Sequence, residues 1–101
     1  MPEPTQDQIT DEVVSRLEAT PDPRLREIMQ AAVKHLHAFA KEVQLTDAEW
    51  FAGIQFLTAT GHMCDDVRQE FILLSDTLGF STLIDSINHS NVEDQIGRAH
   101  V

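Results

Sequence analysis

Apolar residues recur along most of the chain at spacings of three and four. Side chains at these spacings share one face of a helix with 3.6 residues per turn, so the pattern predicts amphipathic helices. Asp22 can cap the clearest of them, and Pro23 suits its first position, where the missing N–H costs nothing. We expect its apolar stripe to be buried, partly within the domain and partly against a partner. The stripe comprises Leu25, Ile28, Met29, Ala32, Val33, Leu36, Phe39, Ala40 and Val43.

One helix is predicted before this stripe and another directly after it. Residues 1–6 contain two prolines and are expected to form a frayed arm, which leads into a helix over residues 7–19. Thr46 and Glu49 form a capping box, T-x-x-E, so the next helix is expected to start at position 47. Gly61 is expected to end that helix, because glycine is favoured just past a helix terminus.

Two further helices are predicted in the second half of the chain. Asp66 with Gln69 repeats the capping pattern and predicts a fourth helix, which Gly79 ends. Ser81 is expected to cap a fifth, short helix. No segment shows a convincing strand pattern, so the predicted fold class is all-α, a small bundle of about five helices with short connections.

Composition narrows the classes of partner. The 101 residues suit one small domain, and seven basic against 17 acidic side chains give a net charge of −10. Such a chain has no excess of positive charge to neutralise phosphates, so we expect no nucleic-acid partner. For the same reason an anionic membrane surface is disfavoured. No apolar run approaches the roughly 20 residues of a membrane span, and the acidic start lacks a signal-peptide core. With Cys64 as the single cysteine, we expect a cytoplasmic protein that is not integral to a membrane.

Residues that bear chemistry are sparse. His35 and His37 lie about 200° apart on a helix and cannot hold one ion together. His62 and Cys64 form a lone His-x-Cys, a weak zinc signal, so a metal-binding bundle would need a cluster that the helix faces do not provide. A structural cysteine is favoured over a reactive one at Cys64. Asp76, inside an otherwise apolar run, lies either on a solvent-facing turn or at the edge of a pocket.

The last six residues look foreign to the rest of the chain. Residues 96–101 read Ile-Gly-Arg-Ala-His-Val, which is what a widely used sequencing-adapter sequence would encode if it were translated. An ordinary polar tail is the alternative interpretation. On the adapter hypothesis, the natural sequence departs from the one given after Gln95.

Several segments together resemble the N-terminal domain of intradiol ring-cleavage dioxygenases. The most specific segment is CDDVRQEFILLSDTLG at 64–79, followed by DSINH at 85–89. These two segments are most similar to the hydroxyquinol 1,2-dioxygenase branch of the family. Their similarity to chlorocatechol 1,2-dioxygenases is somewhat lower, and their similarity to catechol 1,2-dioxygenases is lower still. The resemblance covers roughly residues 8–92. Its other segments are 24–29, 35–39, 49–50 and 56–58.

The resemblance implies a homodimeric enzyme that uses Fe(III) and O₂ to cleave an aromatic diol between its two hydroxylated carbons. In that family two tyrosines and two histidines hold the iron in a downstream β-sandwich domain, and the N-terminal helices form the dimer interface around a channel that holds a phospholipid. This chain contains no tyrosine, so half of that ligand set is absent from it. The sequence thus predicts a helical domain over residues 1–95, an inactive fragment without catalytic or metal-binding residues.

The family's substrate-facing turn carries over to two positions of this sequence. By resemblance they are Leu73, which would pack on the aromatic ring, and Asp76, which would accept a hydrogen bond from the third hydroxyl of hydroxyquinol. A spacing of three places both on one helical face. The rival hypothesis is a stand-alone helical protein-interaction module without a catalytic domain.

Overall fold

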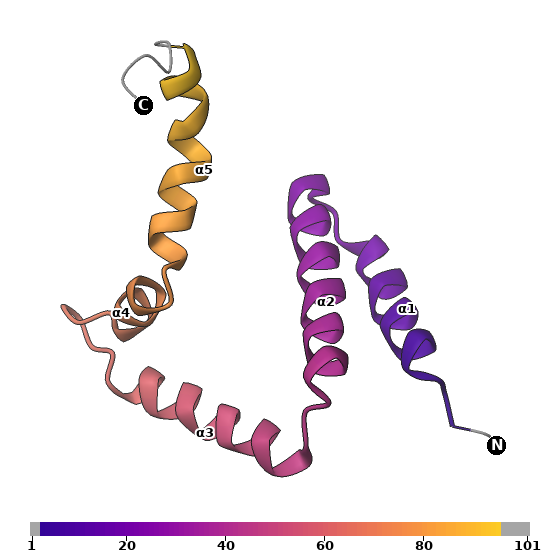
Figure 1. The fold of residues 1–101 in the computed structure, drawn as a ribbon. Helices are drawn as coiled ribbons and strands as arrows, with labels where there is room; N and C mark the ends of the chain where they lie inside the picture. The colour runs from indigo at the N-terminus through magenta and orange to yellow at the C-terminus, as the bar shows by residue number, and fades with distance from the viewer. Residues whose placement is uncertain (1–2, 96–101) are drawn as a thin grey trace. The chain divides into compact units, whose positions relative to one another are not determined.

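The structure, a computed structural model, describes residues 3–95, with side chains described as far as His89. No strand occurs in that part of the chain, so the predicted all-α class with about five helices is confirmed. The suspected adapter-derived tail, 96–101, lies outside the described residues. The elements shown in Figure 1 are α1 (Gln6–Arg16), the 3₁₀ turn η1 (Leu17–Ala19), α2 (Pro23–Val43), α3 (Asp47–His62), α4 (Glu70–Thr77) and α5 (Phe80–Gln95).

Two of the predicted helix starts are confirmed by their caps. The Asp22 carboxylate accepts the backbone N–H of Arg24 at 2.9 Å and that of Leu25 at 3.2 Å at the start of α2. In the capping box of α3, Thr46 Oγ1 accepts the N–H of Glu49 at 3.2 Å and Glu49 Oε1 accepts the N–H of Thr46 at 3.0 Å. Each cap stabilises its helix by about 1 kcal/mol, because it satisfies N–H groups that have no partner within the helix.

The N-terminal arm is one residue shorter than predicted. A second capping box, between Thr5 and Gln8, starts α1 at Gln6. The helix then tightens into η1 at the residues where the prediction placed its last turn.

Gly61 does not end α3, contrary to the prediction. The helix continues to His62, and the N–H of Met63 still reaches the carbonyls of Ala59 and Thr60, both at 3.2 Å. Among the described glycines, only Gly79 has a positive φ, at 74°. Gly79 therefore is the terminator that the sequence predicted after α4.

The starts of α4 and α5 also differ from the prediction. Asp66 does not cap α4, because the helix begins later, at Glu70, with Gln69 as its N-cap. Ser81 does not cap α5 either: it is the second residue of that helix, and its hydroxyl lies 2.7 Å from that of Ser75. The fifth helix is not short, since it has 16 residues.

The chain divides into two units, one ending at Trp50 and one starting at Phe51, and each is described by itself. In the first unit α1 and α2 run side by side (Figure 1) and meet through polar side chains, which we call the polar seam. Gln30 Nε2 donates to the carbonyl of Val14 at 2.9 Å, and Arg26 donates to that of Thr20 at 3.1 Å. The other contacts are Gln30–Glu18 at 3.1 Å, Thr10–His37 at 2.7 Å and Lys41–Asp7 at 3.1 Å.

Most of the apolar stripe of α2 lies outside the polar seam and is exposed. Val33 and Ala40 are half-buried, whereas Leu36 is 63% exposed. Within the first unit by itself, most of the stripe is therefore not buried as expected, because the hydrogen bonds and the ion pair between α2 and the preceding segment run through polar side chains. The exposed members are Leu25, Ile28, Met29, Ala32, Leu36, Phe39 and Val43.

In the second unit α4 and α5 pack against each other across the tight Leu78–Gly79 turn. Thr60 of α3 is the one buried residue among those whose side chains the structure describes, with 8% of its surface exposed, and the apolar ones are half-buried or exposed. Within each unit by itself, the helices thus carry their apolar residues largely on uncovered faces.

The same substitution at two glycines should have opposite effects on stability. Gly79→Ala should cost about 1 kcal/mol, because a Cβ is unfavourable at its left-handed φ of 74°. Gly53→Ala should stabilise by about 0.5–1 kcal/mol, because Gly53 lies inside α3 and nothing lies within 4 Å of an added Cβ. Urea unfolding of the two variants checks both signs, and a stabilised Gly79→Ala would contradict the backbone geometry.

Candidate functional site

The turn between α3 and α4 is organised by two side chains. Asp65 Oδ1 accepts the backbone N–H of Val67 at 2.9 Å and that of Arg68 at 2.7 Å. Gln69 Oε1 accepts the N–H of Phe71 at 3.2 Å, and the thiol of Cys64 also donates to it at 3.2 Å. Cys64 therefore helps to join the end of α3 to the start of α4, which agrees with the structural role predicted for it.

The two backbone N–H groups lower the pKa of the Asp65 carboxyl below its ordinary value of 3.8, with the N–H of Val67 as the larger cause. A lowered pKa in the folded state means that Asp65 stabilises the turn above pH 3.8 and loses that effect as the pH falls through the folded pKa. We expect the NMR titration of its carboxyl carbon to have a midpoint below 3.8. Asp65→Asn should remove the loss of stability that titration of this carboxyl causes on acidification. A titration midpoint of Asp65 at or above 3.8 would contradict the turn geometry.

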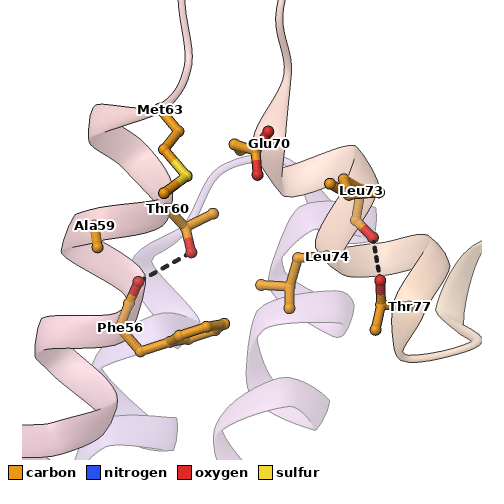
Figure 2. A pocket seen from close by; sticks show the side chains of 8 residues that line it. All are labelled: Phe56, Ala59, Thr60, Met63, Glu70, Leu73, Leu74 and Thr77. Atoms are coloured by element: carbon orange, nitrogen blue, oxygen red, sulfur yellow. Dashed lines mark hydrogen bonds between the residues drawn. The ribbon is translucent and has the colours of Figure 1, made fainter.

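An open pocket of about 360 Å³ lies between α3 and α4, within the second unit (Figure 2). Four residues from α3 and the position just after it face four residues of α4, and both sets follow the spacing i, i+3, i+4 and i+7. Side chains at these positions share one helical face, so two facing stripes form the walls. The lining residues are Phe56, Ala59 and Thr60 of α3, Met63 directly after it, and Glu70, Leu73, Leu74 and Thr77 of α4.

The polar groups of this pocket already have hydrogen-bond or charge partners. The Thr60 hydroxyl donates to the carbonyl of Phe56 at 2.9 Å, and the Thr77 hydroxyl donates to that of Leu73 at 3.0 Å, as the dashed lines of Figure 2 show. The Glu70 carboxylate, whose side chain is only 13% exposed, pairs with the guanidinium of Arg68.

The two residues predicted to face a substrate occupy different surroundings. Leu73 lines the pocket from α4. Asp76, three residues later on the same helix, is exposed and is not among the lining residues, while its backbone carbonyl accepts the N–H of Gly79 at 3.1 Å. The structure thus brings Leu73 together with the α3 stripe and leaves Asp76 on the surface of this chain.

Of the eight residues that line the pocket, sequence reasoning had named only Leu73 as facing a ligand. The signal was present in the repeated spacing 56, 59, 60, 63 and 70, 73, 74, 77. It was overlooked because the first pattern mixes alanine and threonine with apolar residues, and because the predicted start of the fourth helix lay before Glu70.

Neither a metal cluster nor a membrane span stands out in the part of the chain that the structure describes. No three His, Cys, Asp or Glu side chains converge there in a way that could hold a metal ion. Among residues 3–95, no helix combines the length and the apolarity that crossing a bilayer requires.

Comparison with known proteins identifies the family. Residues 22–95 match the sequence profile described as the catechol dioxygenase N terminus. Because this match covers more than half of the chain, the chain belongs to that family. The resemblance seen in the sequence is therefore confirmed.

Individual relatives are hydroxyquinol-type dioxygenases. The chain is 55% identical over 93 residues to the 6-chlorohydroxyquinol 1,2-dioxygenase of Cupriavidus pinatubonensis, covering 92% of this chain and 34% of that protein. It is 50% identical over 86 residues to the hydroxyquinol 1,2-dioxygenase of Rhodococcus opacus, covering 85% of this chain and 29% of that protein. The chain thus spans about a third of the length of the curated relatives it matches.

A solved structure shares the fold. The hydroxyquinol 1,2-dioxygenase from Pseudomonas putida DLL-E4 superposes with a TM-score of 0.80 at 60% sequence identity, covering 83% of this chain and 30% of that chain.

Proposed function

We propose that this chain is the N-terminal helical domain of an intradiol dioxygenase that cleaves hydroxyquinol or a related aromatic diol. The observation that carries the proposal is the 60% identity, with a TM-score of 0.80, to part of a hydroxyquinol 1,2-dioxygenase. The relatives named for 6-chlorohydroxyquinol and hydroxyquinol support this substrate class over catechol, since the catechol 1,2-dioxygenase of Candida albicans is only 34% identical.

Within such an enzyme the domain would supply one wall of the substrate pocket. In this proposal Leu73 packs against the aromatic ring, and Asp76 accepts a hydrogen bond from the third hydroxyl. The spacing of three residues on α4 supports a shared face for the two side chains. Exposure of Asp76 in this chain is compatible with that role, because the part of the relatives that this chain does not match would cover it.

We also propose that the domain forms a homodimer, with its apolar helix faces covered by the twin subunit and by a phospholipid. The exposed stripe of α2, which includes Leu36 and Phe39, supports a partner there, because a contiguous apolar face favours association. The proposed location is the cytoplasm, in keeping with a single free cysteine, Cys64. The proposed domain covers residues 1–95, with 96–101 as an adapter-derived tail.

The ferric iron of these enzymes does not fit the residues of this chain. The sequence contains no tyrosine, and no suitable group of three His, Cys, Asp or Glu side chains occurs among the described residues. The iron ligands of the proposed enzyme would therefore lie in the part of the protein that this chain does not match, and the domain contributes walls and contacts rather than metal chemistry.

The test is to join residues 1–95 to the remaining C-terminal part of the Pseudomonas putida hydroxyquinol 1,2-dioxygenase, which we call the rejoined enzyme. We expect the rejoined enzyme, loaded with iron, to consume O₂ on hydroxyquinol, and the 101-residue chain alone to show neither O₂ uptake nor a visible iron–phenolate band. An inactive but folded and iron-loaded rejoined enzyme would contradict the proposal and favour a stand-alone interaction module.

A further inference from the structure

The direction of α4 depends strongly on how the helix begins and ends, because packing holds it only weakly. The helix has eight residues, which is about two turns, and none of its side chains is fully buried. An element with few buried contacts opens and shifts at low cost unless its ends are tied to their neighbours. The contacts at the start of α4 therefore matter for where its side chains point.

Gln69, the N-cap of α4, is not one of the residue types preferred at that position. Its Oε1 accepts the backbone N–H of Phe71 at 3.2 Å. Asn, Asp, Ser and Thr are preferred as N-caps, and fixing a longer side chain costs more rotamer entropy. The longer side chain also gains a second contact, because the thiol of Cys64 donates to the same oxygen at 3.2 Å. An asparagine oxygen would lie closer to the backbone and would not extend to that thiol.

Cys64 is itself attached to the end of α3. Its backbone N–H donates to the carbonyl of Gly61 at 3.1 Å, and its thiol lies 3.6 Å from the carbonyl of Thr60, farther than from Gln69. The Asp65 carboxylate, by contrast, bonds to N–H groups within the turn. The Gln69 oxygen thus connects the last turn of α3 with the first turn of α4.

We propose that Gln69 is a positioning residue, whose bond to Cys64 fixes the direction of α4 relative to the end of α3. Leu73 and Asp76 follow four and seven residues later, on the same side of the helix as Gln69. The role in substrate preference rests on the proposed function, in which these two side chains face the substrate. Gln69 does not line the α3–α4 pocket, so it acts through α4.

The first experiment measures amide residual dipolar couplings of α3 and α4 in the isotope-labelled 101-residue chain. Gln69→Asn introduces a preferred N-cap that is too short to reach Cys64, whereas Gln69→Glu keeps both the length and the acceptor. We expect Gln69→Asn to change the couplings of α4 relative to those of α3 without lowering the urea midpoint. Gln69→Glu should keep the parent pattern.

The matched control is Gln55→Asn, which makes the same chemical change at an exposed position of α3 and should leave the couplings of α4 unchanged. Cys64→Ala removes the donor and should reproduce the effect of Gln69→Asn. The two changes together should add nothing further, because they break one bond. Unchanged couplings in Gln69→Asn, or additive effects of the two substitutions, would overturn the proposal.

The second experiment measures substrate preference in the rejoined enzyme. Gln69→Asn should lower the ratio of kcat/KM for hydroxyquinol to kcat/KM for catechol by about 3- to 10-fold, because a turned α4 misplaces Asp76 and catechol has no third hydroxyl. Gln69→Glu should restore most of the ratio. Equal losses for both substrates would mean that Gln69 only caps α4, and would refute its role in positioning.

Asp76→Ala in the same enzyme separates this inference from the proposed function. If Asp76→Ala lowers the ratio and Gln69→Asn does not, the positioning role of Gln69 fails while the proposed function stands. If Asp76→Ala leaves the ratio unchanged, the proposed role of Asp76 fails, and the effect of Gln69 on preference fails with it.

Discussion

Replacing Asp76 with alanine in the rejoined enzyme is expected to lower kcat/KM for hydroxyquinol by roughly 10- to 150-fold. A charged acceptor that binds a buried hydroxyl is worth about 1.5–3 kcal/mol, and about 1.4 kcal/mol corresponds to a factor of ten. Steady-state O₂ uptake on hydroxyquinol and on catechol measures the effect. Catechol has no third hydroxyl, so its kcat/KM should fall little or rise, because a desolvated carboxylate would no longer lie unpaired beside its ring.

The ratio of kcat/KM for hydroxyquinol to kcat/KM for catechol shows which role Asp76 has. Equal losses for hydroxyquinol and catechol would mean that Asp76 supports α4 rather than reading the third hydroxyl. Asp76→Asn keeps an uncharged acceptor and should retain part of the preference. The neighbouring Ser75→Ala is a useful control, since the Ser75 hydroxyl lies 2.7 Å from that of Ser81 and serves the α4–α5 contact instead.

Leu36→Ala is expected to cost about 2–5 kcal/mol of stability in the rejoined enzyme but much less in the 101-residue chain. In the chain this side chain is 63% exposed, so truncating it removes little buried area. In the proposed dimer the α2 stripe is enclosed, and the full cost of a buried cavity then applies. Urea unfolding of both proteins, with and without the substitution, measures the difference.

Val33→Ala is the matched control for that comparison. Val33 is already half-buried in the chain by itself, so its truncation should cost a similar amount in both proteins. If Leu36→Ala were equally mild in the rejoined enzyme, the exposed stripe would not be the covered interface. The homodimer proposal for α2 would then fail, while the assignment to the dioxygenase family would stand.

The helices with strong local signals could be predicted from the sequence. Asp22 with Pro23, and Thr46 with Glu49, determine where α2 and α3 start, because a cap is a short-range hydrogen-bond pattern that a few residues encode. Gly79 ended α4 as predicted, since its positive φ suits glycine. Gly61 failed as a terminator because it keeps a helical conformation that glycine can equally adopt, and no local signal distinguishes the two cases.

The candidate site was only partly predictable for a different physical reason. Leu73 and Asp76 came from family resemblance, and only Leu73 lines the observed pocket. The facing stripe of α3 depends on how two helices meet, which is a long-range property that the spacing of either helix alone does not determine. For the same reason the exposure of Leu36 was missed: periodicity identifies an apolar face but not which neighbour covers it.

The polar seam has a consequence for how freely the start of the chain can vary. Gln30 and Arg26 of α2 hold the preceding segment by the backbone carbonyls of Val14 and Thr20, groups that nearly every amino acid presents alike. These two bonds use only backbone groups of that segment, whereas the other three contacts of the seam depend on the side chains of Asp7, Thr10 and Glu18. The family profile begins at residue 22 and leaves α1 outside its match. Substitutions at Asp7, Thr10 and Glu18 are therefore expected to loosen the contact with α2, whereas the bonds to the carbonyls of Val14 and Thr20 do not depend on which side chain those two residues carry.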